Sequence, residues 1–201
     1  MRKGLIVLLV VAGVIVLLAI AGTSQYNGLV NLQEDVTSQW AEVENSYQRR
    51  ADLIPNLVAT VKGAAKFEQD TLTQVTEARA RVGQVTAQTG AGAPDDPQAL
   101  QRFAQAQDQL SSALSRLLVV VERYPELKAV QGFNDLMASL EGTENRIAVA
   151  RKRYNDAARD FNATRRRVPT SWFISMLGWD FPPKAYFEAQ AGASTVPEVE
   201  L

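Results

Sequence analysis

The sequence predicts an all-α protein in which an N-terminal transmembrane helix precedes an antiparallel, up-down four-helix bundle. Three observations lead to this fold class. The chain of 201 residues begins with a long uncharged apolar run. The remainder carries apolar residues three and four positions apart, which is the period of an amphipathic helix. No stretch shows the sustained alternation of a strand. We therefore divide the chain into a transmembrane anchor at residues 1–23, a helical bundle at 24–187 and a flexible acidic tail at 188–201.

The anchor is predicted from residues 4–22, which contain no charged side chain. A helix needs about 20 apolar residues to cross a bilayer. Arg2 and Lys3 precede the run, and basic residues favour the cytoplasmic side. We therefore expect a single-pass protein with its N-terminus in the cytoplasm and its bundle outside. A cleaved signal peptide is the alternative, because the sequence AIA at residues 19–21 fits a cleavage pattern. The length of the run favours an uncleaved signal anchor.

Four helices are predicted after the anchor, at residues 24–51, 53–88, 97–123 and 131–167. Their similar lengths suit a bundle in which each helix runs antiparallel to the one before it. Asp96 is expected to cap the third helix, with Pro97 at its first position. The apolar stripe of the fourth helix recurs every seven residues and is expected to lie in the core: Phe133, Leu140, Ile147, Tyr154 and Phe161.

The stretch QRRADLIPNLVATVKG, residues 48–63, is interpreted as the break between the first two helices. Arg49 and Arg50 suit the last turn of a helix, because positive charge there complements the helix dipole. Asp52 is a good N-cap, and Pro55 would then lie in the first turn, where a missing N–H costs nothing. The alternative is one long helix kinked at Pro55. We favour the turn, which would return the fourth helix toward the membrane, whereas the kink would end it far away.

The segment RRRVPTSWFISMLGWDF at residues 165–181 combines basic and aromatic side chains. One interpretation is a lid that packs over the open end of the bundle. The other is an interfacial segment, with Trp at the level of the lipid headgroups and Arg facing anionic lipid. The candidate membrane-interface residues are Arg165, Arg166, Arg167, Trp172, Phe173 and Trp179.

The fourth helix carries the densest run of polar residues. Glu144 and Arg151 lie two turns apart, so they are expected to share a face and to pair with another helix. A polar network between helices is favoured over a binding groove. Glu141 and Glu144 form one E-x-x-E pair, but no second such pair occurs at matching depth and the chain has no histidine. We therefore expect no metal site.

Composition narrows the classes of function. Lys and Arg number 21 against 22 Asp and Glu, so no bulk positive field indicates a nucleic-acid partner. The chain has neither cysteine nor histidine. Their absence excludes thiol chemistry and removes the commonest general base and metal ligand. We expect no catalytic residue, no cofactor and no small-molecule substrate.

Four runs, RRADLIPNLV, YPELKA, EGTENRI and ARKRYN, closely resemble the LemA family, and the similarity extends over roughly residues 24–187. The resemblance implies a bacterial single-pass membrane protein with a helical-bundle domain and no established catalytic residues. We predict a membrane-anchored scaffold of the cell envelope that self-associates or binds another envelope protein, with membrane lipid as its other partner. The alternative is a lipid-binding or membrane-remodelling protein that uses the C-terminal Arg and Trp residues.

Overall fold

The computed structural model describes residues 2–62, 69–89, 95–125 and 131–188. All regular secondary structure within these ranges is helical, which confirms the predicted all-α class. The helices are α1 (Arg2–Lys62), α2 (Gln69–Thr89), α3 (Pro97–Val121), α5 (Gln131–Arg166) and α6 (Thr170–Leu177).

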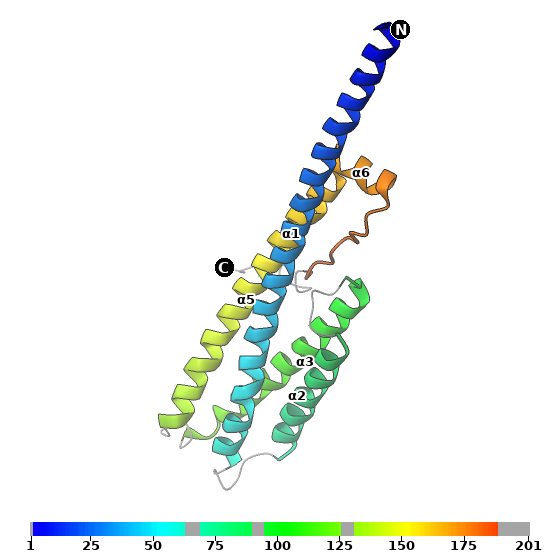
Figure 1. Cartoon of the computed structure of the whole chain (residues 1–201). Helices are drawn as coiled ribbons and strands as arrows, with labels where there is room; N and C mark the ends of the chain where they lie inside the picture. Colours follow the sequence, from blue (N-terminus) through cyan, green and yellow to red (C-terminus); the bar gives the residue numbers. More distant parts are fainter. Residues whose placement is uncertain (1, 63–68, 90–94, 126–130, 189–201) are drawn as a thin grey trace, which may run out of the picture.

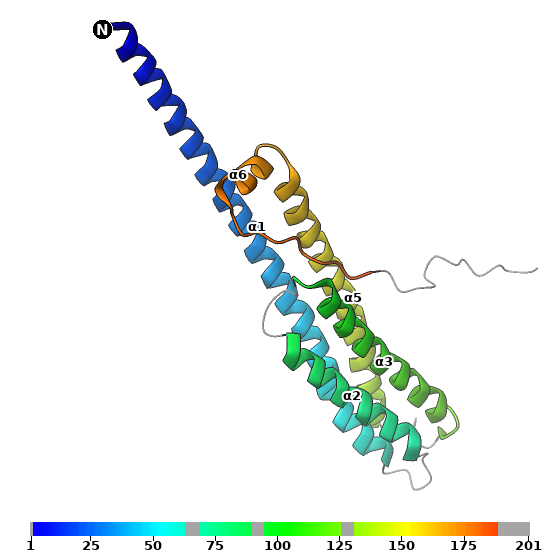
Figure 2. The same ribbon diagram turned by 90° about the vertical axis from the view of Figure 1, so that its right-hand side faces the viewer.

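The helices pack as two pairs (Figure 1). α5 lies along α1, and α2 lies along α3. The α2–α3 pair covers the part of α1 and α5 that is farthest from the N-terminus, and α6 lies against α1 at the opposite end (Figure 2). The structure does not contain the predicted four helices of similar length. α1 has 61 residues, whereas α2 and α3 have 21 and 25.

Pro55 lies inside α1, so the predicted turn between residues 51 and 53 is wrong. The helical boundaries expected at 51 and 53 are wrong with it. Asp52 is not an N-cap, because it lies within α1 and accepts a hydrogen bond from Gln48 Nε2 at 2.7 Å. The first reversal of the chain comes after Lys62, and residues 63–68 lie outside the described ranges.

The polar contacts around Pro55 explain how a helix continues through it. Proline has no N–H, so the Ala51 carbonyl lacks the donor that it would accept from in an uninterrupted helix. Arg79 Nε of α2 donates to this oxygen at 3.0 Å. The acceptor that Pro55 leaves open therefore becomes a docking point for α2. α5 still returns toward the N-terminal part of α1 (Figure 1), so the expectation that a continuous helix would carry the fourth helix away from the membrane is also wrong.

Other predicted elements are confirmed. Asp96 caps α3 and accepts from Gln98 N at 2.8 Å, with Pro97 at the first helical position. α5 ends at Arg166, one residue before the predicted boundary. The stripe of α5 that recurs every seven residues is buried throughout. Of the predicted tail, residues 189–201 lie outside the described part of the chain.

The core divides into two clusters along the length of the domain. The cluster farther from the N-terminus is mainly aliphatic, and Ile54, Leu110 and Leu117 lie in it together with Phe133. The nearer cluster is aromatic and contains these rings: Trp40, Tyr47, Phe103, Tyr154, Phe161, Phe181 and Phe187. The aromatic cluster therefore lies between the aliphatic core and the apolar N-terminal segment.

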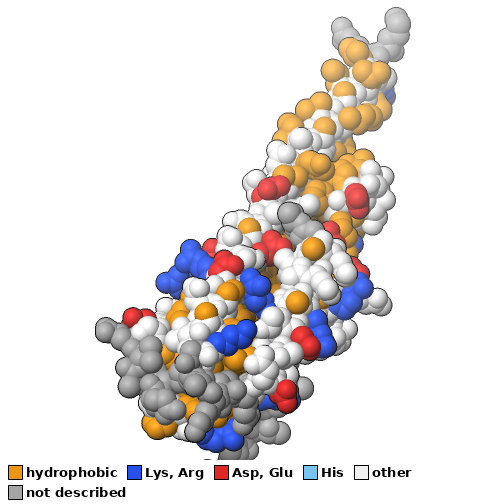
Figure 3. All heavy atoms as spheres, turned by 90° about the horizontal axis from the view of Figure 1, so that it is seen from below, with side chains coloured by type: hydrophobic (Ala, Val, Ile, Leu, Met, Phe, Trp, Pro, Cys, Tyr) orange, Lys and Arg blue, Asp and Glu red, His pale blue; other side chains and the backbone are white. Residues whose placement is uncertain are grey.

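The N-terminal segment of α1 projects beyond the domain (Figures 1 and 2). Its best window has a mean hydropathy of 3.2, and none of it is buried. Figure 3 shows this segment covered by hydrophobic side chains, whereas charged side chains gather on the helical domain. By length and composition, α1 is able to cross a membrane.

Candidate functional site

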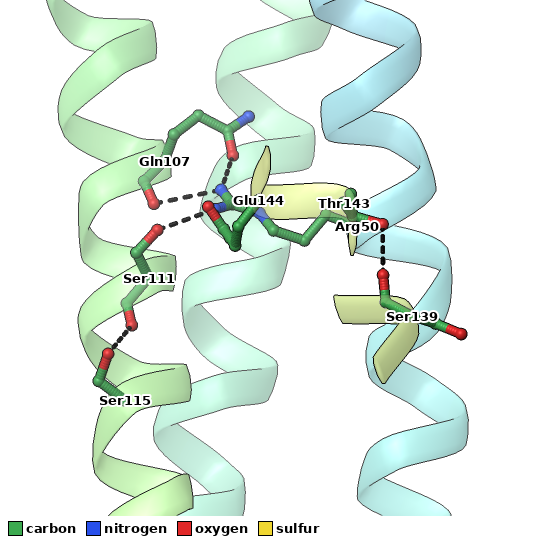
Figure 4. A network of polar contacts seen from close by, with 7 residues as sticks. All are labelled: Arg50, Gln107, Ser111, Ser115, Ser139, Thr143 and Glu144. Atoms are coloured by element: carbon green, nitrogen blue, oxygen red, sulfur yellow. Dashed lines mark hydrogen bonds and ion pairs between the residues drawn. The ribbon is translucent and has the colours of Figure 1, made fainter. Parts of the chain in front are cut away.

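One arginine is fully buried at the centre of the helical domain. Arg50 of α1 is 1% exposed. Its Nη1 donates to Glu144 Oε1 at 2.7 Å and to Ser111 Oγ at 2.8 Å. Its Nη2 donates to Gln107 Oε1 at 2.5 Å and to the Gln107 carbonyl at 3.3 Å. The guanidinium also lies 5.1 Å from the centroid of the Tyr47 ring. Figure 4 shows Gln107, Ser111 and Glu144 converging on Arg50 from the neighbouring helices.

The Arg50 network joins α1, α3 and α5 at one level of the domain. A buried charge is costly unless it is paired and hydrogen-bonded. Glu144 supplies the opposite charge, but its side chain is 48% exposed, so water screens the ion pair. Gln107 and Ser111 supply neutral acceptors. Arg50 Nε has no hydrogen-bond partner within the described ranges. The hydrogen bonds of Arg50 therefore hold α1, α3 and α5 together.

The residues predicted around this network have separate roles. Glu144 and Arg151 do not pair with the same helix. Glu144 meets Arg50 of α1, whereas Arg151 Nη2 donates to the Glu188 carbonyl at 3.2 Å and lies 4.7 Å from the centroid of the Phe187 ring. Arg49, next to Arg50, is exposed.

Residues 179–188 follow α6 as a segment without regular secondary structure, which we call the strap. Two asparagines of α5 hold it. Asn162 Nδ2 donates to the Lys184 carbonyl at 2.8 Å, and Asn162 Oδ1 accepts from Lys184 N at 2.9 Å. Asn155 makes the same pair of bonds to Phe187, both at 2.9 Å. Seven helical residues rise about 10.5 Å, and three extended residues span about 10 Å, so the two spacings match.

The strap completes the aromatic cluster. The Phe187 ring is stacked 6.0 Å from Trp40 and lies edge-on to Tyr154 at 5.5 Å. Lys184 is buried, and its Nζ lies 2.5 Å from Asp95 Oδ1. The Tyr154 hydroxyl donates to the Ala185 carbonyl at 3.0 Å. Burial raises the pKa of the Tyr154 phenol, which keeps it protonated as a donor.

Sequence reasoning missed the two asparagines. A signal for them exists, because each follows a residue of the buried stripe of α5 and they are themselves seven residues apart. They therefore lie beside the core face at equivalent positions two turns apart.

α6 packs on α1 where the apolar run ends. The Phe173 ring lies over Gly22, and a Cβ at Gly22 would be 3.3 Å from Phe173 Cε1. The glycine therefore permits the close approach of α6. Thr170 Oγ1 donates to Gln25 Oε1 at 2.6 Å, one turn farther along α1.

A left-handed glycine directs the chain from α6 back onto α1. Gly178 has a φ of +66° and ends α6, a conformation that costs glycine little. Trp179 then stacks on Phe173 with centroids 5.8 Å apart and meets the edge of Tyr26 at 5.1 Å. α6 is thus held against the residues that follow the apolar run.

The six predicted interface residues lie together at this end of the domain, but they differ in exposure. Phe173 is buried and Trp179 is half-buried, as a lid requires. Trp172 is 66% exposed. Arg165 is half-buried, and its Nε donates to the Phe181 carbonyl at 2.5 Å. Arg166 and Arg167 are exposed.

The profile of the LemA family matches residues 39–201. The chain belongs to the LemA family. The match covers the C-terminal part of α1 and all the later helices, and it confirms the resemblance seen in the four sequence runs.

This LemA family chain is also similar to three magnetosome proteins. It is 27% identical over 189 residues to magnetosome proteins MamQ 1 and MamQ 2 of Paramagnetospirillum magneticum, covering 85% of this chain and 67% of each relative. It is 26% identical over 211 residues to magnetosome protein MamQ of Magnetospirillum gryphiswaldense, covering 97% of this chain and 77% of the relative. With the apolar N-terminal helix, these likenesses indicate a membrane-associated protein.

Proposed function

We propose that this LemA family protein is a membrane-anchored scaffold of the cell envelope, without catalytic activity of its own, that binds other envelope proteins or further copies of itself. One observation carries the proposal. α1 continues as a single helix from the apolar segment to Lys62, so its anchor and its domain are parts of one element. α5 packs along it and stiffens the portion outside the membrane.

The chemistry of the site supports a structural role. The buried charge of Arg50 is directed at three side chains of neighbouring helices. The sequence offers no histidine or cysteine for proton transfer or nucleophilic attack. Residues 39–201 match a family profile, and the resemblance carries no catalytic residues with it.

The proposed orientation places the N-terminus in the cytoplasm and the helical domain outside. Arg2 and Lys3 precede the apolar run, and basic flanks favour the cytoplasmic side. Val119 is 68% exposed on α3, and the chain has no native cysteine. We expect Val119→Cys to react in intact cells with a membrane-impermeant maleimide that has access to the outer face of the membrane. Reaction only after lysis would reverse the orientation.

The scaffold role is tested by mass and by partners. The full chain, purified in detergent, is expected to run as a self-assembled species or to co-purify with a second envelope protein in native mass spectrometry. Crosslinking at single introduced cysteines in native membranes should trap the same contacts. A monomer with no crosslinked product in either setting would contradict the proposal.

Lipid binding with membrane remodelling is a second candidate function. It is favoured by the exposure of Trp172 and Met176 beside the apolar segment. Electron microscopy of vesicles that carry the reconstituted chain tests it. Tubules or constrictions that disappear in a Trp172→Ser, Met176→Ser variant are expected from remodelling, and unchanged spherical vesicles at every protein density argue against it.

A further inference from the structure

One face of α6 and the turn before it is apolar and exposed. Trp172 and Met176 are 66% and 69% exposed, and they lie four residues apart, on the same side of the helix. Val168 and Leu177 are also more than half exposed. The surfaces of soluble proteins commonly carry single exposed apolar residues. A group of this size on an eight-residue helix and the turn before it marks an interaction surface.

The position of this face along α1 is fixed by three contacts. Phe173 packs on Gly22, Thr170 bonds to Gln25, and Trp179 packs on Tyr26. Gly22 is the last residue of the apolar run, and the polar residues Thr23, Ser24 and Gln25 follow it. At 1.5 Å per residue, residues 4–22 rise about 28 Å, close to the hydrocarbon thickness of about 30 Å. α6 therefore docks at the level where a spanning α1 leaves the hydrocarbon.

The surroundings of α6 favour lipid as the occupant of its exposed face. The apolar surface of α1 up to Ile20 is exposed and reaches the docking site of α6, so the two surfaces form one continuous apolar region. Tryptophan is enriched where a protein passes through lipid headgroups. Arg166 and Arg167 lie exposed at the end of α5, next to this face, and cations there attract anionic headgroups.

We propose that α6 is an interfacial helix that lies in the leaflet through which α1 emerges. Trp172, Met176 and Leu177 contact lipid, whereas Phe173 and Trp179 hold α6 on α1. The proposal rests on the anchor of the proposed function and adds a second attachment of the domain to the bilayer. This attachment fixes the tilt and rotation of the domain relative to the membrane surface.

The test uses the full chain in vesicles of phosphatidylethanolamine and phosphatidylglycerol. Single cysteines are placed at Met176, Ser175, Val119 and Leu9, and each is labelled with an environment-sensitive fluorophore. Quenchers are attached to the lipid chains or dissolved in water. Ser175 is the matched control, because it is exposed on α6 one position away from Met176. Val119 reports on the far end of the domain, and Leu9 reports on the anchor.

We expect the label at Met176 to be quenched from the lipid, with a blue-shifted emission, and the label at Val119 to be quenched only from water. The label at Ser175 should be more accessible to water than that at Met176. Water quenching at Met176 as strong as at Val119 would overturn the proposal. Shielding of Met176 from both quenchers would also overturn it, because protein would then cover the face. Lipid quenching at Leu9 in either case would show that the N-terminal part of α1 is still inserted in the membrane.

A paired substitution tests the docking contact. Gly22→Leu places a side chain against Phe173, whereas Gly28→Leu, on the same helix, enters open space. We expect Gly22→Leu to weaken lipid quenching at Met176 and Gly28→Leu to leave it unchanged. Equal quenching in the two variants would contradict the role of Gly22 in positioning α6.

Discussion

The charge of Arg50 is tolerated in the core because both terminal nitrogens of its guanidinium donate to acceptors on α3 and α5. Glu144 is half exposed, so water screens its charge, whereas Gln107 is a buried acceptor and Ser111 a partly buried one. Removal of the guanidinium would leave these acceptors without a donor, and an unpaired buried polar group costs more than a lost hydrogen bond contributes.

We therefore predict that Arg50→Met lowers the free energy of unfolding by about 2 kcal/mol, the cost of leaving a buried acceptor unsatisfied, measured by urea denaturation of the detergent-solubilised chain. Glu144→Gln keeps an acceptor and should cost about 1 kcal/mol. Arg49→Met is the matched control at the exposed neighbour and should stay within about 0.5 kcal/mol of the wild type. Equal effects of Arg49→Met and Arg50→Met would show that the network does not stabilise the domain.

Pro55 and Arg79 are coupled through one backbone carbonyl. Pro55→Ala restores the helical donor to the Ala51 carbonyl and should stabilise α1, because proline is the least favourable residue in a helix interior. In the wild type, Arg79→Ala removes the substitute donor and should cost about 1 kcal/mol.

The measurement is a double-mutant cycle in urea. We expect Arg79→Ala to cost less in the Pro55→Ala background, since the carbonyl is then satisfied within the helix. Arg81→Ala removes an exposed side chain of α2 that donates to Gln109 of α3, so it should have the same effect in both backgrounds. If the changes in unfolding free energy caused by Pro55→Ala and Arg79→Ala simply add in the double variant, the two residues are not coupled through the Ala51 carbonyl.

The conformation of the strap depends on side chains of α5. It has no backbone ladder of its own, and Asn155 and Asn162 satisfy the backbone groups of Phe187 and Lys184. Its side chains in turn cover Trp40 and Tyr154. The strap and α5 therefore stabilise each other.

We predict that Asn162→Ala opens the strap locally. The amide of Lys184 loses its acceptor, so its hydrogen exchange, followed by mass spectrometry, should accelerate at least about tenfold, the equivalent of 1.4 kcal/mol. Exchange in α2 and α3 should change little. Asn145→Ala, at an exposed position of the same helix, serves as the control. Unchanged protection of residues 179–188 in Asn162→Ala would contradict this role.

For the whole molecule, α1 sets the dimensions. Its 61 residues run from the apolar N-terminal segment to the far end of the domain, and the 40 steps from Gly22 to Lys62 rise about 60 Å. The tip of the domain formed by the ends of α1 and α3 and the start of α5 therefore stands well away from the end that carries α6 (Figure 1). On the function proposed above, this tip would hold a partner at a distance from the bilayer that the length of α1 sets.

Spin labels at Ser24→Cys and Ala59→Cys measure this directly. A continuous helix predicts a narrow distance distribution near about 52 Å, at 1.5 Å per residue. A reversal close to Pro55 would instead bring the labels within about 35 Å on the same rise per residue. A short or bimodal distribution would therefore contradict an unbroken α1.

Features that depend on local periodicity and composition could be predicted from the amino-acid sequence alone. The apolar run, the buried stripe of α5, the Asp96 cap and the all-α class all follow from residues close together in the chain. Each is dominated by a local preference or by the period of one helix, so no information about distant residues is required.

The continuation of α1 through Pro55 and the partners of Arg50 and Asn162 depend on contacts between distant parts of the chain. The cap signals at Asp52 and Pro55 are compatible with a turn, but the carbonyl that Pro55 leaves open finds a donor 28 residues away in Arg79. The acceptors of Arg50 lie 57 to 94 residues away. Such bonds depend on how helices are placed side by side, and the energy of packing outweighs the weak local preferences of a few residues.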